Sequence, residues 1–292
     1  MPTGDPQTTM KKETFSLYEG AIPGDLPGGV HPTVTYYAAE HKRTDATVVI
    51  FPGGGYSMRA PHEGEGYALY LNQAGMDTFV VDYRCTPTHF PYELLDARRA
   101  VRLVRANAVR YGIDPGKVAV MGSSAGGHLA AMLCTYRGDI PGENTDAADK
   151  ENYLPNAQIL CYPVINTTVD GIRHYGSVEN LLGKDNLDFA PQVSPEQIAD
   201  GMTPPAFFFH TAEDAGVTVI NSYRYATRLR ELNIPVEMHV FPYGHHGLGL
   251  CQSEPSTPGA YEAGRISSFL WEDAQWGVLL KNWLILMGYL PA

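Results

Sequence analysis

Residues 118–136 place a Gly-x-Ser-x-Gly pentapeptide between a short β-branched run and a helical pattern. The pentapeptide runs from Gly122 to Gly126, and its central serine is Ser124. A serine at such a tight turn from strand to helix adopts a strained backbone conformation, with its hydroxyl pointing out of the sheet. Small residues at Gly122, Gly126 and Gly127 allow strand and helix to pass close together. A plain Gly/Ser-rich turn is the alternative, but the flanking elements favour Ser124 as a nucleophile.

Short apolar runs alternate with helical patterns along the rest of the chain. This alternation predicts an α/β fold, with a mostly parallel sheet covered by helices on both faces. The expected strands lie at residues 34–39, 46–51, 78–83, 118–121, 157–162, 206–210 and 236–241. The expected helices lie at residues 63–73, 91–111, 129–136, 217–232 and 271–287.

Two of these segments carry more specific expectations. The helix at 91–111 has apolar residues on one side, among them Leu94, Val101 and Val109, and many arginines on the other. An amphipathic pattern of this kind is typical of a helix that covers a sheet. Residues 1–30 are rich in Gly and Pro, so we expect them to wrap around the surface.

No repeat, low-complexity tract or long linker divides the 292 residues, which predicts a single domain over residues 1–292. Residues 164–204 interrupt the alternation because they are polar, rich in Gly and Pro, and only weakly helical around 178–182. A long insertion between two sheet strands is usually a lid or a binding loop. We predict that role for this segment; a surface excursion without a function is the alternative.

The composition narrows the possible partners and cofactors. A net charge of −11 disfavours binding to nucleic acid and to anionic membranes. The four cysteines form no Cys-x-x-Cys pair and no spacing typical of zinc ligands, so we expect reduced buried thiols, no metal and no cofactor. Residues 1–10 are polar and contain no apolar signal-peptide core, which predicts a cytoplasmic location; removal of a leader would leave the same sequence.

A nucleophilic serine needs a base within hydrogen-bond reach and a carboxylate that orients the base. The acid is expected downstream of the serine, at the end of another strand. The run 207–209 ends just before Glu213 and Asp214, and a helical pattern follows. We predict Asp214 as the acid, with Glu213 as the second choice. The alternative is that both carboxylates cap the following helix.

The base is expected in a Gly-rich loop after the last strand. His245 and His246 lie between Gly244 and Gly247 in this loop. A turn can direct only one of the two imidazoles at Ser124, and we predict His246 because it directly precedes Gly247.

A triple glycine follows the expected central strand at 46–51. Attack on a carbonyl creates a negative oxygen, which preorganised N–H donors stabilise. Known phosphate-binding glycine patterns need neighbours that are missing here, which favours an oxyanion site over a phosphate cradle. We predict donors at Gly54, Gly55 and Ala125, the residue after the nucleophile, and the N–H of Tyr56 is an alternative on the glycine loop.

These motifs together resemble the α/β-hydrolase superfamily. Within it, the chain is similar to the bacterial carbohydrate-esterase branch of acetyl xylan esterase-like and feruloyl esterase-like enzymes. The resemblance rests on residues 51–59, 82–84, 111–115, 121–129, 210–214 and 244–247. It implies an eight-stranded, mostly parallel sheet and the triad roles of Ser124, His246 and Asp214. Pro52 stands where the lipase-like branch has His before its glycines, which favours the carbohydrate-esterase group.

The resemblance implies a serine esterase without cofactor that deacetylates plant-type polysaccharides or oligosaccharides. Its partner is then a small-molecule or oligosaccharide ester, and the sequence leaves homo-oligomers open. Feruloyl esterase and small-ester carboxylesterase share the same triad, and a catalytically silent binding module is the alternative from another class. Pocket walls are expected at Tyr56, Met58, His89 and Tyr162, for which core packing is the alternative interpretation.

Overall fold

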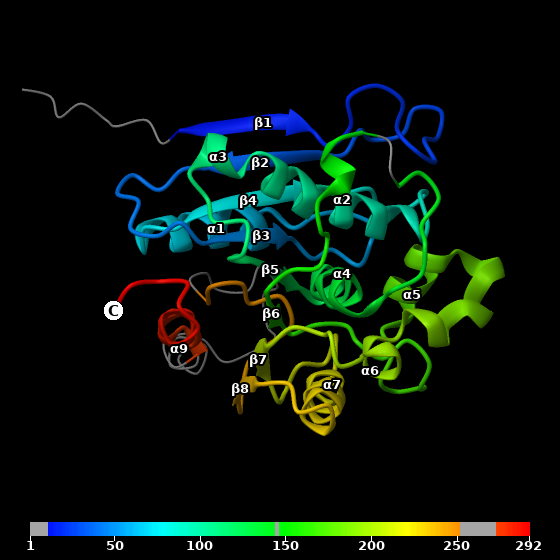
Figure 1. Cartoon of the computed structure of the whole chain (residues 1–292). Coiled ribbons are helices and arrows are strands. Elements are labelled where there is room, and N and C mark those ends of the chain that lie inside the picture. Colours follow the sequence, from blue (N-terminus) through cyan, green and yellow to red (C-terminus); the bar gives the residue numbers. More distant parts are fainter. Residues whose placement is uncertain (1–10, 144–145, 252–272) are drawn as a thin grey trace, which may run out of the picture.

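An eight-stranded sheet is the centre of the molecule, and helices cover both of its faces (Figure 1). The structure is a computed structural model that describes residues 11–143, 146–251 and 273–292. The strand order is β1-β2-β4-β3-β5-β6-β7-β8. Strands β1 and β2 pair antiparallel at one side, and all pairings from β4 to β8 are parallel. This confirms the expected α/β fold with a mostly parallel sheet.

The strands lie close to the positions expected from the apolar runs. They are β1 Lys12–Ser16, β2 Thr33–Tyr37, β3 Thr47–Phe51, β4 Asp77–Asp82, β5 Val118–Ser123, β6 Ala157–Cys161, β7 Ala206–Thr211 and β8 Val236–Phe241. Strand β1 corrects the prediction that residues 1–30 only wrap the surface. It is a short polar edge strand, so it carries no apolar run that a sequence pattern could reveal.

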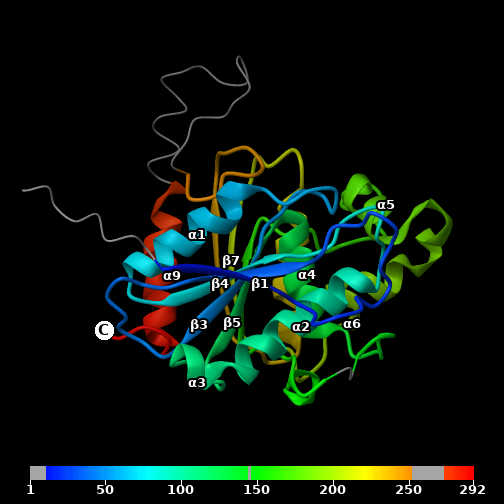
Figure 2. The same ribbon diagram turned by 90° about the horizontal axis from the view of Figure 1, so that it is seen from above.

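Two clusters of buried apolar residues lie on opposite faces of the sheet. Successive residues of a strand point to opposite faces, and in β3 Val49 and Phe51 join one buried cluster while Val48 and Ile50 join the other. Helices α1 Pro61–Gln73 and α9 Gln275–Leu286 cover the second cluster, whereas α2 Tyr92–Ala106, α4 Ser124–Thr135 and α7 Ile220–Glu231 cover the first (Figure 1 and Figure 2). No helix among the described residues is long and apolar enough to span a bilayer.

The helix expected at 91–111 breaks at Asn107 into α2 and the short α3 Ala108–Tyr111. Val109, expected on the apolar side, is 98% exposed as a result. The arginines expected on the polar side are buried, namely Arg98, Arg99, Arg102 and Arg105. Carboxylates and carbonyl groups of residues 136–154 accept most of their hydrogen bonds, and these long-range partners explain why the local pattern failed.

One buried ion pair ties α2 to the loop after β4. Asp96 on α2 accepts hydrogen bonds from the backbone N–H, Nε and Nη2 of Arg84, at 2.9, 2.9 and 2.7 Å. The Tyr18 hydroxyl donates to the same carboxylate at 2.9 Å. Both members of the ion pair are almost fully buried. The pair is therefore shielded from water, and losing one partner leaves an uncompensated charge.

We predict that Asp96→Ala lowers the free energy of unfolding by about 3–5 kcal/mol, because it leaves the buried Arg84 guanidinium without its carboxylate partner. Chemical denaturation followed by circular dichroism measures the loss. Asp45→Ala is the control, since Asp45 pairs with Lys117 at the surface, where an ion pair contributes about 0–1 kcal/mol. Equal effects of the two substitutions would contradict the prediction.

Candidate functional site

Ser124 stands at the junction of β5 and α4, as the pentapeptide predicts. Its φ is +53°, a left-handed conformation that disfavours a residue with a side chain. Holding such a residue costs about 1–3 kcal/mol and occurs mainly at functional sites. The site therefore lies at the carboxyl edge of the sheet, on a sharp turn between a buried strand and a buried helix.

Glycines let three backbone segments meet around this turn. A Cβ atom on Gly126 would overlap the carbonyl oxygens of Phe51 and Pro52, and one on Gly122 would overlap the Gly126 carbonyl. A Cβ atom on Gly53 would lie 3.0 Å from the Ser124 Cβ. The nucleophile turn thus packs directly against the loop after β3, which is possible only without side chains at these positions.

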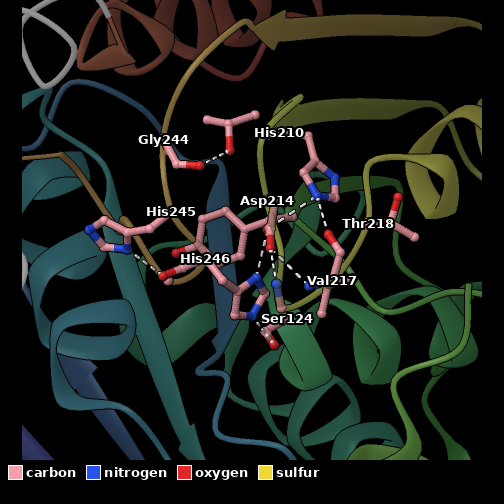
Figure 3. Close-up of polar contacts among 12 residues, drawn as sticks. Ser124, His210, Asp214, Val217, Thr218, Gly244, His245 and His246 are labelled. Carbon is pink, nitrogen blue, oxygen red and sulfur yellow. Dashed lines mark hydrogen bonds and ion pairs between the residues drawn. The ribbon is translucent and has the colours of Figure 1, made fainter. Parts of the chain in front are cut away.

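His246 connects Ser124 to Asp214 (Figure 3). The His246 Nε2 is 2.7 Å from the Ser124 Oγ, and the His246 Nδ1 is 2.7 Å from the Asp214 Oδ2. The carboxylate can only accept, so Nδ1–H donates to it and Nε2 is left to accept from the serine hydroxyl. The structure thus brings together the three residues predicted as nucleophile, base and acid.

The second choices for acid and base do not join this arrangement. Glu213 is exposed to solvent next to the buried Asp214. The His245 Nδ1 lies 2.6 Å from the His246 carbonyl oxygen, and its ring points away from Ser124 (Figure 3). A Cβ atom on Gly216 would lie 2.9 Å from the His246 Cβ, so this glycine permits the close approach of the acid and base loops.

Several donors hold the Asp214 carboxylate in its ionised form. Its Oδ1 accepts hydrogen bonds from the N–H groups of Gly216 and Val217, at 2.9 and 2.8 Å. The buried His210 Nε2 lies 3.3 Å from Oδ2. Burial alone raises the pKa of Asp214, but His210, His246 and the Val217 N–H outweigh it and hold the pKa well below its usual range.

Asp214 does not cap the following helix, which was the alternative interpretation. Helix α7 begins at Ile220, and its N-cap residue Val219 offers no side-chain hydrogen bond. The N–H groups that donate to Asp214 belong to the turn before the helix. This carboxylate therefore stabilises the loop that carries it. Within the described ranges, no group of three or more His, Cys, Asp or Glu side chains is arranged to hold a metal ion.

The glycine loop follows β3 and faces the nucleophile turn. The Gly53 N–H donates to the Glu63 Oε2 at 2.8 Å. Gly54 and Gly55 have φ values of +136° and +63°, which glycine adopts readily. The Ala125 N–H lies in the first turn of α4, where the helix supplies no acceptor. These positions are compatible with the predicted donors Gly54, Gly55 and Ala125.

The residues predicted as pocket walls lie in different environments. Tyr56 and Tyr162 are buried, and the Tyr56 hydroxyl lies 2.7 Å from the His128 Nδ1, so core packing describes Tyr56 better. The Tyr162 ring packs edge-on against the His246 ring, with 5.2 Å between centroids. Met58 is exposed beside the glycine loop, whereas the His89 Nδ1 lies 2.8 Å from the Asn180 carbonyl oxygen.

The insertion at 164–204 reaches the site, through residues that no sequence motif marked. It contains α5 Tyr175–Leu182, a 3-10 segment Lys184–Val193 and α6 Pro195–Ile198 (Figure 1). The Asn180 side chain donates to the Gly55 carbonyl oxygen at 2.8 Å. Burial lowers the pKa of His174, the residue before α5, and the charge of His246 lowers it further.

Comparison with known proteins gives a consistent set of relatives. The BD-FAE family model matches residues 35–229. Endo-1,4-beta-xylanase B of Butyrivibrio fibrisolvens is 40% identical over 71% of this chain and 33% of its own length. Acetylxylan esterase of Xylanibacter ruminicola is 33% identical over 69% of this chain and 41% of its own length. The chain therefore spans about a third to two fifths of these relatives.

A solved structure resembles the chain over nearly its whole length. It is the acetyl ester-xyloside bifunctional hydrolase from Caldicellulosiruptor lactoaceticus, with a TM-score of 0.84 and 34% sequence identity. The match covers 95% of this chain and 97% of that chain. The two chains therefore share the fold over nearly their whole length.

We predict that the protein loses stability as the pH falls from about 6.5 to about 4, partly through His128. The Val193 carbonyl can only accept, so the His128 Nε2 carries the proton and Nδ1 accepts from Tyr56. Burial lowers the pKa of His128 to about 4, so within this window the unfolded chain binds the extra proton. The cost reaches about 3 kcal/mol at the lower limit. Urea denaturation at several pH values measures it, and an unchanged pH dependence in His128→Gln would argue against this role.

We predict that Asp214→Asn lowers kcat on p-nitrophenyl acetate by about 10³–10⁴-fold while the protein stays folded. The amide cannot fix the imidazole tautomer that accepts the serine proton. Steady-state kinetics with circular dichroism as a folding check measure the effect. Glu213→Gln is the matched control and is expected to stay within about twofold of wild type, since Glu213 is exposed. A larger loss of kcat in Glu213→Gln than in Asp214→Asn would identify Glu213 as the acid instead.

Proposed function

Because this chain belongs to the BD-FAE family of α/β-hydrolase esterases, we propose that it is a serine esterase that deacetylates xylan-type polysaccharides or their oligosaccharides. One observation carries the proposal. The Ser124 Oγ, the His246 imidazole and the Asp214 carboxylate form a continuous hydrogen-bonded line, with 2.7 Å in each step. A hydroxyl held by a base in this way is an activated nucleophile for acyl transfer.

In the proposed acylation step, the Ser124 Oγ attacks the acetyl carbonyl carbon and its proton passes to the His246 Nε2. The carbonyl π electrons move to the oxygen, which the N–H groups of Gly54, Gly55 and Ala125 stabilise. When the tetrahedral adduct collapses, the bond to the sugar oxygen breaks and His246 gives its proton to that oxygen. The products of this step are the free sugar hydroxyl and acetylated Ser124.

Deacylation repeats the same steps with water. His246 takes a proton from water, and the resulting hydroxide attacks the acetyl-serine carbonyl carbon. Collapse of the second adduct breaks the Ser124 ester bond, returns the proton to Oγ and releases acetic acid, which gives its proton to solvent and becomes acetate. Asp214 stays ionised throughout and stabilises the imidazolium that forms twice, which agrees with its lowered pKa.

The choice of acetylated xylan follows from the names of the relatives. One is a xylanase, one an acetylxylan esterase, and the solved structure is an acetyl ester-xyloside hydrolase. All three names refer to xylan or to a xyloside, and two refer to acetyl esters. Feruloyl and small-ester hydrolysis use the same chemistry and differ in the shape of the pocket, so a substrate comparison has to decide between them.

We predict that Ser124→Ala lowers kcat on p-nitrophenyl acetate by at least about 10³-fold, because the acyl-enzyme forms on the Ser124 hydroxyl.

A second test compares acetate release from acetylated xylan and acetylated mannan with ferulate release from methyl ferulate. Preferential acetate release from xylan is the expected result. Equal rates for wild type and Ser124→Ala would contradict the nucleophile, and preferential ferulate release would contradict the acetyl substrate.

A further inference from the structure

Glu63 is a buried carboxylate that the steps above do not use. It lies in the first turn of α1 and is 3% exposed. Its Oε2 accepts the Gly53 N–H at 2.8 Å, and its Oε1 accepts the Tyr162 hydroxyl at 2.8 Å. Each oxygen therefore holds a different segment, one from the loop after β3 and one from the end of β6.

Tyr162 extends this connection to the loop that carries the base. Its hydroxyl oxygen accepts the Gly249 N–H at 2.8 Å, three residues after His246. Its ring lies edge-on against the imidazole of His246. Through the Tyr162 hydroxyl, Glu63 is thus connected to the base loop and to the residue whose ring packs against His246.

Tyr67, one turn along α1 from Glu63, reaches the nucleophile strand. Its hydroxyl lies 3.1 Å from the Tyr162 hydroxyl and 2.9 Å from the Ser123 Oγ. Gly53 lies between Glu63 and the nucleophile, because a Cβ atom there would meet both the Glu63 Oε2 and the Ser124 Cβ. The network thus touches the glycine loop, the nucleophile turn and the base loop.

We propose that Glu63 is a positioning residue that sets the oxyanion donors and the His246 imidazole relative to each other. Holding the Gly53 N–H fixes the plane of its peptide and hence the direction of the N–H groups that follow. Holding the Tyr162 hydroxyl fixes the position of the Tyr162 ring, which packs against the His246 imidazole. A displacement of about 1 Å in such a site lowers the rate by about 10²-fold. The inference rests on the proposed esterase function, since it assigns a role within that site.

The experiment compares Glu63→Leu and Glu63→Gln with wild type on p-nitrophenyl acetate. Leucine removes both acceptors at similar volume, so we expect kcat to fall by about 10²-fold, with KM within about threefold. Glutamine keeps one acceptor oxygen, so we expect a partial rescue, with kcat about tenfold below wild type. The matched control is Glu65→Gln on the same helix, where the exposed carboxylate pairs with Lys12, and its kcat should stay within about twofold.

Thermal melts show whether each variant is folded at the assay temperature. A folded Glu63→Leu with kcat within threefold of wild type would overturn the proposal. If Glu63→Leu does not fold, Tyr162→Phe decides, because it keeps the ring and removes only the hydroxyl. A kcat loss of about threefold or more at unchanged KM then supports the proposal, and a smaller loss overturns it. Wild-type hydrolysis that does not depend on Ser124 is a different failure, that of the proposed function.

Discussion

Close contact between backbones makes this site possible. The turn at Ser124 approaches the carbonyl groups of Phe51 and Pro52 so closely that Gly126 has no room for a side chain. Strands β3 and β5 are parallel neighbours, with Phe51 opposite Gly122 in the register. The glycine loop after β3 and the turn at Ser124 after β5 therefore begin next to each other. Any residue larger than glycine at position 126 would push the Ser124 turn away from the loop that follows β3.

The acid and base loops depend on the same edge of the sheet. Strands β7 and β8 end side by side, with Thr211 opposite Phe241, and the loops that follow carry Asp214 and His246. Burial makes the carboxylate costly to ionise, and the hydrogen bonds from the acid loop and from His210 offset that cost. The charge beside the His246 imidazole is therefore maintained by His246 together with His210 and the acid loop.

Much of the fold and of the site was predictable because the informative patterns are local. Apolar runs marked all strands from β2 to β8, and each predicted triad residue lies in the turn or loop that follows one of them. The structure brings Ser124, Asp214 and His246 within hydrogen-bond reach, while their chemical roles stay predictions. The helix expected at 271–287 agrees with α9 from Gln275 onward, whereas residues 271 and 272 lie outside the described residues.

Features that depend on distant partners were not predictable. The buried arginines of α2 are stable there because residues far along the chain accept their hydrogen bonds, and a helical pattern contains no trace of them. Glu63 was equally hidden, since a glutamate in the first turn of a helix is ordinary and only the fold brings Gly53 and Tyr162 to it. Strand β1 was missed because a polar edge strand lacks the apolar run on which recognition depends.

The hydrogen bond from Asn180 to the Gly55 carbonyl has an evolutionary consequence. It ties the insertion between β6 and β7 to the glycine loop, where the oxyanion donors are predicted, and surface segments of this kind usually vary between homologues. If this segment binds substrate as predicted, changes there that alter substrate preference would also move the glycine loop and affect turnover. Homologues that diverge in this region are then expected to retain a donor at the equivalent point, and a grafted loop without one would change turnover together with preference.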